Sequence, residues 1–154
     1  MKKIITKKRV SYFIFGIVGV YILAVGISAV MMSQTTQITY DAHGEGLKLR
    51  TIVIDFKENT AQNIYYNLYD VNLGLPLEIK EYPINTSTKL QIKTVCSFSL
   101  FPLWRKNYYN YRILDGDEYY ITITYGNNER VIYGANSYPL TYRPVMWIIR
   151  KTVK

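Results

Sequence analysis

Residues 12–32, YFIFGIVGVYILAVGISAVMM, divide this chain into a membrane segment and a folded domain. They lie inside a longer run, residues 10–40, that contains no charged side chain. As an α-helix, these 21 residues would extend about 31 Å at ~1.5 Å per residue, which matches a hydrocarbon core of roughly 30 Å. The sequence therefore predicts one transmembrane helix over residues 10–32, in contact with membrane lipid.

The charges on either side of this helix predict its orientation. Five basic residues and no acidic residue precede it, namely Lys2, Lys3, Lys7, Lys8 and Arg9. Because the more basic flank of a single span stays in the cytoplasm, residues 1–9 are expected to form a cytoplasmic leader and residues 33–154 to lie outside the cell. The alternative is a signal peptide cleaved near Ile27-Ser28-Ala29, although such peptides have a shorter apolar stretch of roughly 7–15 residues.

The chain beyond the helix is long enough for one domain with its own core. We expect residues 33–46 to form a polar stalk and loop, and residues 47–154 to form an extracytoplasmic domain. The net charge of +8 is carried mostly by the leader, and residues 33–154 hold 14 basic against 11 acidic residues. A nucleic-acid partner needs a concentrated basic patch, so this balance argues against one.

The pattern of residues 47–154 predicts an α+β fold with an antiparallel sheet. Residues 119–125 alternate strictly, and a Gly126-Asn-Asn128 turn and a returning strand follow, which together are a strong hairpin signal. After Pro144, apolar residues at helical spacing predict a short C-terminal helix packed on the sheet. Further strands are expected over residues 47–56 and 77–82.

Two segments fit both helix and strand. In residues 63–71 the tyrosines and the flanking turn residues favour a strand. Residues 88–101 suit either element, and Pro102 marks their end. The periodicity of these short segments leaves the choice open.

Few residues in the chain are typical of catalysis or metal binding. His43 is the only histidine and Cys96 the only cysteine, which excludes an internal disulfide and leaves too few ligands for a zinc site. Cys96 has apolar neighbours and is expected to be buried. Asp115, Asp117 and Glu118 lack the spacing of a calcium loop and indicate a solvated turn. We therefore predict no catalytic residue, no metal and no cofactor; an envelope hydrolase using paired carboxylates is the alternative class.

The last third of the chain contains a distinctive order of residues. It runs Leu103-Trp-Arg-Lys-Asn-Tyr-Tyr-Asn-Tyr111, then Asp115-Gly116, the strand over residues 119–125, and Gly134-Ala-Asn136-Ser-Tyr138-Pro139. This order resembles small domains of Firmicutes-type bacteria, of no established activity, that end in Gly-x-Asn-x-Tyr-Pro and a helix. Tyr120 departs from that pattern, which usually has a tryptophan near this position. The resemblance implies an α+β fold and transfers no site. Gly134 and Asn136 both permit a positive φ.

Residues in and around this motif are the candidate binding residues, namely Trp104, Tyr108, Tyr109, Tyr111, Asn136 and Tyr138. Aromatic side chains dominate binding hot spots, so these residues predict a recognition surface. The alternative is that they form the core beneath the terminal helix. We predict a single-pass, membrane-anchored, non-enzymatic interaction module that binds an envelope protein or a cell-wall polymer. A narrower version is a small immunity or phage-exclusion membrane protein.

Overall fold

The computed structural model describes residues 7–44, 47–66, 76–110, 112 and 117–154. Its order of elements confirms an α+β fold with an N-terminal apolar helix and a short C-terminal helix. The elements are α1 (Lys7–Gln34), β1 (Thr35–Gly44), β2 (Leu47–Asp55), β3 (Thr60–Tyr66), β4 (Pro76–Pro83), α2 (Thr86–Phe98), the 3₁₀ turn η2 (Phe101–Leu103), β5 (Asn107–Tyr109), β6 (Asp117–Tyr125), β7 (Asn128–Ala135) and α3 (Tyr142–Thr152).

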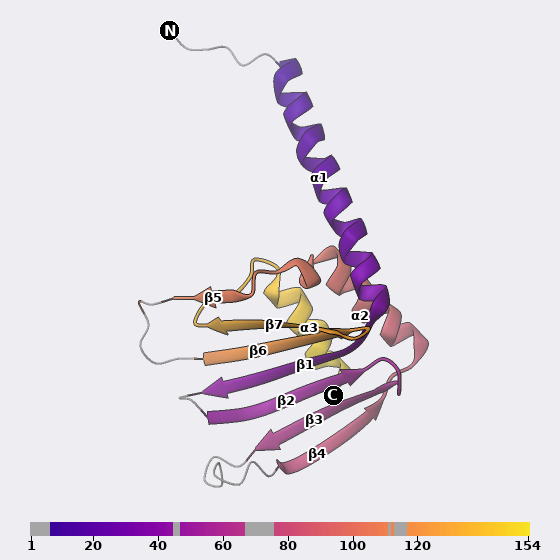
Figure 1. Ribbon diagram of the computed structural model, residues 1–154, viewed down its shortest axis with the longest axis vertical. Coiled ribbons are helices and arrows are strands. Elements are labelled where there is room, and N and C mark those ends of the chain that lie inside the picture. Colours follow the sequence, from indigo (N-terminus) through magenta and orange to yellow (C-terminus); the bar gives the residue numbers. More distant parts are fainter. Residues whose placement is uncertain (1–6, 45–46, 67–75, 111, 113–116) are drawn as a thin grey trace.

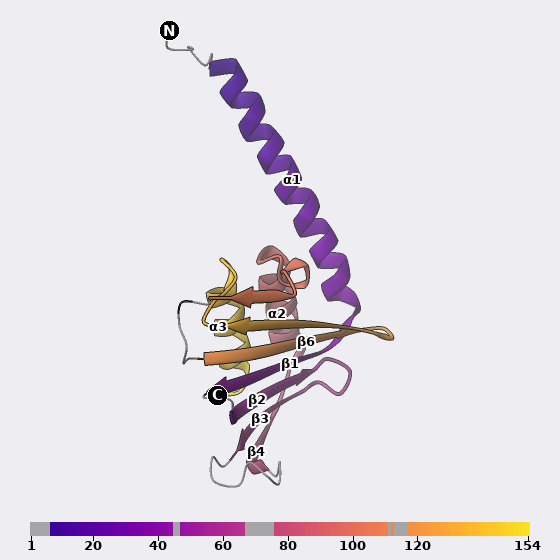
Figure 2. The ribbon, with the colours of Figure 1, turned by 60° about the vertical axis from the view of Figure 1, so that its left-hand side comes forward.

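The strands form one seven-stranded sheet in the order β4-β3-β2-β1-β6-β7-β5 (Figure 1). All neighbours pair antiparallel except β5 and β7, which pair in parallel over three residues. Helices α2 and α3 cover one face of the sheet (Figure 2). Their buried residues Ile92, Val145 and Ile149 join the isoleucines of the central strands in one core. We call the opposite face, which these two helices leave uncovered, the open face.

Strand β1 corrects the expected stalk and loop over residues 33–46. Thr35–Gly44 forms a central strand that directly continues α1, between β2 and β6. Ile38 and Tyr40 are buried toward α2 and α3, paired with Ile54 and Ile52 of β2. The segment has a polar composition because its alternate residues, such as Thr39, lie on the open face. The folded domain therefore begins at β1, and its first strand lies at the centre of the sheet.

The C-terminal turns of α1 pack on the domain. Ser28 and Met32 are buried, the hydroxyl of Tyr21 donates to the carbonyl of Phe98 at 2.9 Å, and the ammonium of Lys93 donates to the carbonyl of Ser33 at 3.1 Å. The rest of the helix projects away from the sheet (Figures 1 and 2). Residues Ser11–Gln34 have the length and apolar composition of a membrane span. The joint between this helix and the domain is therefore packed and hydrogen-bonded.

The structure decides the two ambiguous segments. Residues 63–66 belong to β3, as favoured, whereas residues 67–71 lie outside the described part of the chain. Residues 88–98 belong to α2, whose N-terminus is capped by Asn85: its side-chain oxygen accepts from the amide of Thr88 at 2.8 Å. The expected strands over residues 47–56 and 77–82, the β6–β7 hairpin and the C-terminal helix are confirmed.

Candidate functional site

An aromatic row crosses one end of the open face. Its rings come from four neighbouring strands: His43 of β1, Tyr120 of β6, Tyr133 of β7 and Tyr109 of β5. Adjacent ring centroids are 5.2, 4.8 and 5.2 Å apart along this order. We call these four residues the aromatic row. Because Tyr120 alternates with the buried Tyr119 and Ile121, pleating points its ring away from the core.

Burial and the carboxylate of Glu118 raise the pKa values of two phenols of the row, those of Tyr133 and Tyr120. Burial, a hydrogen bond to Glu118 and the negative charge of that residue raise the pKa of Tyr133 to about 12. Burial and the same charge also raise the pKa of Tyr120. Both phenols therefore remain neutral at physiological pH. They present hydroxyl groups beside flat apolar rings, which suits contact with sugar or peptide surfaces.

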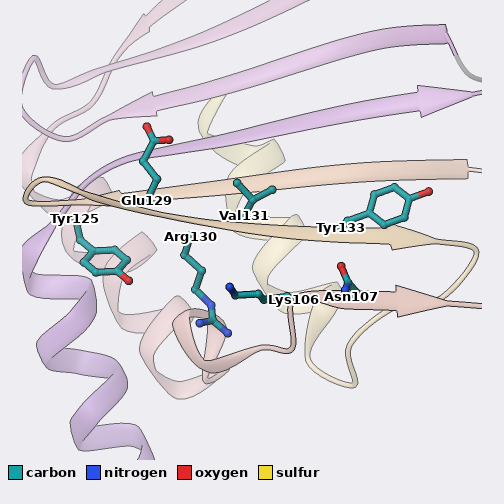
Figure 3. Close-up of a pocket in the computed structure, with 7 residues that line it drawn as sticks. All are labelled: Lys106, Asn107, Tyr125, Glu129, Arg130, Val131 and Tyr133. Atoms are coloured by element: carbon teal, nitrogen blue, oxygen red, sulfur yellow. The ribbon is translucent and has the colours of Figure 1, made fainter.

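A pocket of about 440 Å³ adjoins the row between β7 and the start of β5 (Figure 3). Tyr133 belongs to both the row and the pocket. Glu129 is the one carboxylate lining it, opposite the cations Lys106 and Arg130. The guanidinium of Arg130 donates to the carbonyl of Trp104, which ties the pocket wall to the segment before β5. The remaining lining residues are Asn107, Tyr125 and Val131.

The structure separates the candidate binding residues that the sequence grouped together. Trp104 is only 5% exposed, and its indole N–H donates to the carbonyl of Ser99 and the hydroxyl of Thr141. Tyr108 is half-buried, and its hydroxyl accepts from the amide of Arg105 at 2.9 Å. Both side chains pack with the core, as the alternative interpretation expected.

The other four candidates lie in different places. Tyr109 is exposed and belongs to the aromatic row. Tyr138 is exposed beside the opposite face, where it stacks on Tyr119 with centroids 5.4 Å apart. Asn136 has the expected positive φ of 51°, and its amide donates to the carbonyl of Asp117. Tyr111 lies outside the described residues.

Gly134 corrects one local expectation. Its φ is not in the left-handed region, where Gly126 and Asn136 lie. The position instead lacks a side chain because the ring of Tyr119 occupies that space. The sequence motif therefore reflects a packing requirement at Gly134 and a backbone requirement at Asn136.

Sequence reasoning missed three members of the aromatic row, namely His43, Tyr120 and Tyr133. A signal for two of them was present. In the predicted hairpin, Tyr120 falls on the side of the strand opposite Ile121, and the register places Tyr133 directly across from it. His43 carried no such signal, because its place beside Tyr120 requires the long-range pairing of β1 with β6.

No family model matches this chain, and no curated protein matches it. The resemblance to small Firmicutes-type domains therefore stays a prediction. Within the described residues, no group of three His, Cys, Asp or Glu side chains is placed to hold a metal ion. Buried Cys96 is a free thiol, as expected, and burial raises its pKa.

Proposed function

We propose that this protein is a single-pass, membrane-anchored binding module that presents the open face of its sheet outside the cell. The observation that carries the proposal is the aromatic row, which spans four strands of a sheet joined directly to α1. Flat rings held by neighbouring strands form a rigid platform that loses little conformational entropy on binding. The partner is an envelope protein or a cell-wall polymer.

The anchor supports a fixed presentation of this surface. Because β1 continues α1 without a linker and the last turns of α1 pack on α2, the domain has a defined orientation relative to the helix. A partner in the envelope would therefore meet the same face in every copy. Such pre-orientation lowers the entropic cost of association.

The composition of the pocket favours binding over carboxylate hydrolysis. Two convergent acids would be needed for glycosidic acid–base chemistry. The pocket beside the row is lined by one carboxylate, Glu129, and faces two cations. A pocket with mixed charges and an aromatic wall suits recognition of a polar chain.

The orientation is tested by labelling whole cells. In a Cys96→Ala background, a cysteine introduced at Asn127, in the exposed β6–β7 turn, should react with a membrane-impermeant maleimide. A cysteine introduced at Thr6 of the basic leader should react only after the cells are opened. The opposite labelling pattern would reject the outside location.

The binding surface is tested by photo-crosslinking in cells. A photoreactive phenylalanine analogue replaces Val131, which is 48% exposed on the open face and lines the pocket beside Tyr133. The matched control replaces Leu90, which is 66% exposed on α2. We expect a discrete adduct from position 131 that is lost in Tyr133→Ala and Tyr120→Ala variants. Equal adducts from positions 131 and 90 would reject the open face as the binding surface.

A further inference from the structure

A second concave surface lies on the opposite side of the sheet, between α3 and β2. Its volume is about 370 Å³, and we call it the α3 groove. The residues that matter for its chemistry are Arg50, Arg143, Trp147, Arg150, Lys151 and Lys154. It lies on the face that α2 and α3 cover, away from the aromatic row, so it is a separate site.

The charge of this groove is all of one sign. Five cationic side chains line it, and no Asp or Glu side chain does. They are more than a third of the 14 basic residues that follow the membrane helix, so the fold concentrates a charge that looked dispersed in the sequence. The structure gives none of the five an ion pair with a described acidic residue; the pair it does show joins Lys80 to Glu78 on the edge strand β4. Like charges crowded in this way repel one another and attract anions.

The helix dipole explains only part of this cluster. Arg150 and Lys151 lie in the last turn of α3, where cations are favourable. Arg143 lies in the first turn, which contains no acid and where a cation is unfavourable. Arg50 belongs to β2 and gains nothing from the helix. A ligand that interacts with both arginines accounts for their presence.

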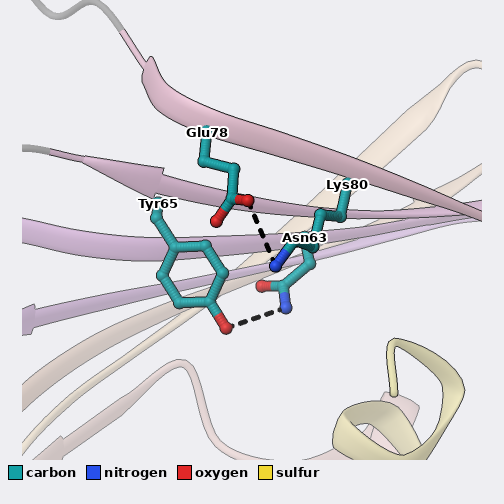
Figure 4. A network of polar contacts seen from close by, with 4 residues as sticks. All are labelled: Asn63, Tyr65, Glu78 and Lys80. Atoms are coloured by element: carbon teal, nitrogen blue, oxygen red, sulfur yellow. Dashed lines mark hydrogen bonds and ion pairs between the residues drawn. The ribbon is translucent and has the colours of Figure 1, made fainter.

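Arg50 is held in place before any ligand arrives. Its Nε donates to Oδ1 of Asn63 at 2.7 Å, and its guanidinium carbon lies 5.4 Å from the centre of the Tyr65 ring. Asn63 in turn donates from Nδ2 to the hydroxyl of Tyr65 at 3.1 Å (Figure 4). This network uses one edge of the guanidinium and leaves its terminal nitrogens for an anion.

The groove also has a flat apolar wall. Trp147 is 59% exposed, and the ammonium of Lys151 lies 4.9 Å from the centre of its ring. The ligand therefore meets cations beside an aromatic surface. Along α3, Arg143 and Lys151 are eight residues apart, which corresponds to about 12 Å at ~1.5 Å per residue. Charges spread over that length match several phosphates in a chain better than a single ion.

We infer that the α3 groove binds a phosphodiester-linked polymer. Guanidinium groups match phosphate oxygens in a bidentate geometry, and three of the five cations are arginines. The C-terminal end of α3 lies away from the free end of α1 in both views of the molecule (Figures 1 and 2). The groove therefore extends away from the bilayer that holds α1, which favours a soluble polymer over a lipid headgroup. The inference does not depend on the aromatic row.

The test uses the full chain in nanodiscs of zwitterionic lipid, titrated with poly(glycerol phosphate). Binding is followed by the fluorescence of Trp147, with Trp104 as the buried second tryptophan. We expect saturable binding that weakens as salt rises, because the polymer releases counterions. The variant Arg50→Gln/Arg143→Gln should weaken binding about tenfold or more, since each lost hydrogen bond to a charged group has an effect of that order. Near-UV circular dichroism checks that the variant is folded.

The matched control is Lys57→Gln/Arg112→Gln, which removes the same charge from exposed positions outside the groove. We expect it to bind like the wild type. Equal weakening by both variants would show attraction to net charge and would overturn the site. Equally tight binding of polyglutamate would overturn the phosphate preference. Binding only to nanodiscs containing phosphatidylglycerol would overturn the polymer as occupant.

Discussion

The ring of Tyr119 lies directly over Gly134, its cross-strand partner in the β6–β7 pair. A Cβ atom at position 134 would lie 2.1 Å from Cζ and 2.3 Å from Oη of Tyr119. The ring is buried, and its hydroxyl donates to the carbonyl of Ser137 at 3.1 Å. The missing side chain of the glycine therefore makes room for the tyrosine, which links the hairpin to the loop before α3.

Replacing Gly134 with alanine should destabilise the protein. The added methyl group must displace the Tyr119 ring, and overpacking of this kind costs about 1–3 kcal/mol. The free energy of unfolding, measured by denaturant titration of the full chain in detergent, tests this. In a Tyr119→Leu background the same Gly134→Ala change should cost much less. Additive effects of the two substitutions would contradict the contact.

Substitution should lower the stability of the fold at Trp104 and leave it nearly unchanged at Tyr109. Trp104→Phe removes the indole donor to Ser99 and Thr141 and part of a buried ring, which together should cost about 1–3 kcal/mol of stability. Tyr109→Ala alters an exposed ring and should change stability by less than about 1 kcal/mol. Thermal unfolding followed by near-UV circular dichroism checks both. A larger loss of stability from Tyr109→Ala would place that residue in the core.

Local pattern predicted the elements whose structure depends on near neighbours. The β6–β7 hairpin follows from strict alternation around a Gly/Asn turn, and the apolar helix follows from composition alone. The helix α2 carried a usable signal in Asn85, a good N-cap residue, although the periodicity after it was ambiguous. The structure of each of these elements is determined by residues close to it in the sequence.

Long-range pairing decided the features that the sequence missed. Thr35–Gly44 contains few apolar residues, and its place at the centre of the sheet depends on β2 and β6. Trp104 is buried in the core, and its indole N–H donates to the hydroxyl of Thr141, which is 37 residues away in the sequence. Neither the aromatic row nor the α3 groove is contiguous in sequence, so no window of the chain contains either site.

Alkaline pH should destabilise the fold. The pKa of Tyr133 is raised to about 12 in the folded protein, chiefly by burial and by Glu118, whereas a tyrosine in the unfolded chain titrates near 10. The folded state therefore binds the Tyr133 proton more tightly than the unfolded state does. The contribution of this phenol to the free energy of unfolding is complete below pH ~10 and is lost as pH rises toward about 12. The pKa of Tyr120 shifts in the same direction.

The measurement is the unfolding midpoint of the full chain between about pH 8 and pH 11. We expect the midpoint to stay constant at the lower pH values and to fall above pH ~10. Tyr133→Phe should make the fall shallower, because phenylalanine has no proton to lose. Val131→Thr, at an exposed position on the same strand, removes no ionisable group and should leave the fall unchanged. An unfolding midpoint that rises with pH in this range would contradict the sign.

Cys96 should react slowly with thiol reagents until the domain opens. The thiol is fully buried on α2, and burial raises its pKa, so little thiolate is available or accessible at neutral pH. We expect alkylation by a maleimide to be at least about a hundredfold slower than in denaturant, because reaction requires local or global opening. The exposed cysteine of a Cys96→Ala/Asn127→Cys variant should react at the denatured rate throughout.

Because α2 packs against the last turns of α1, the Ser28→Leu substitution should also speed labelling of Cys96 by disturbing that contact. Unchanged labelling in Ser28→Leu would mean that the domain keeps its core when the anchor is displaced.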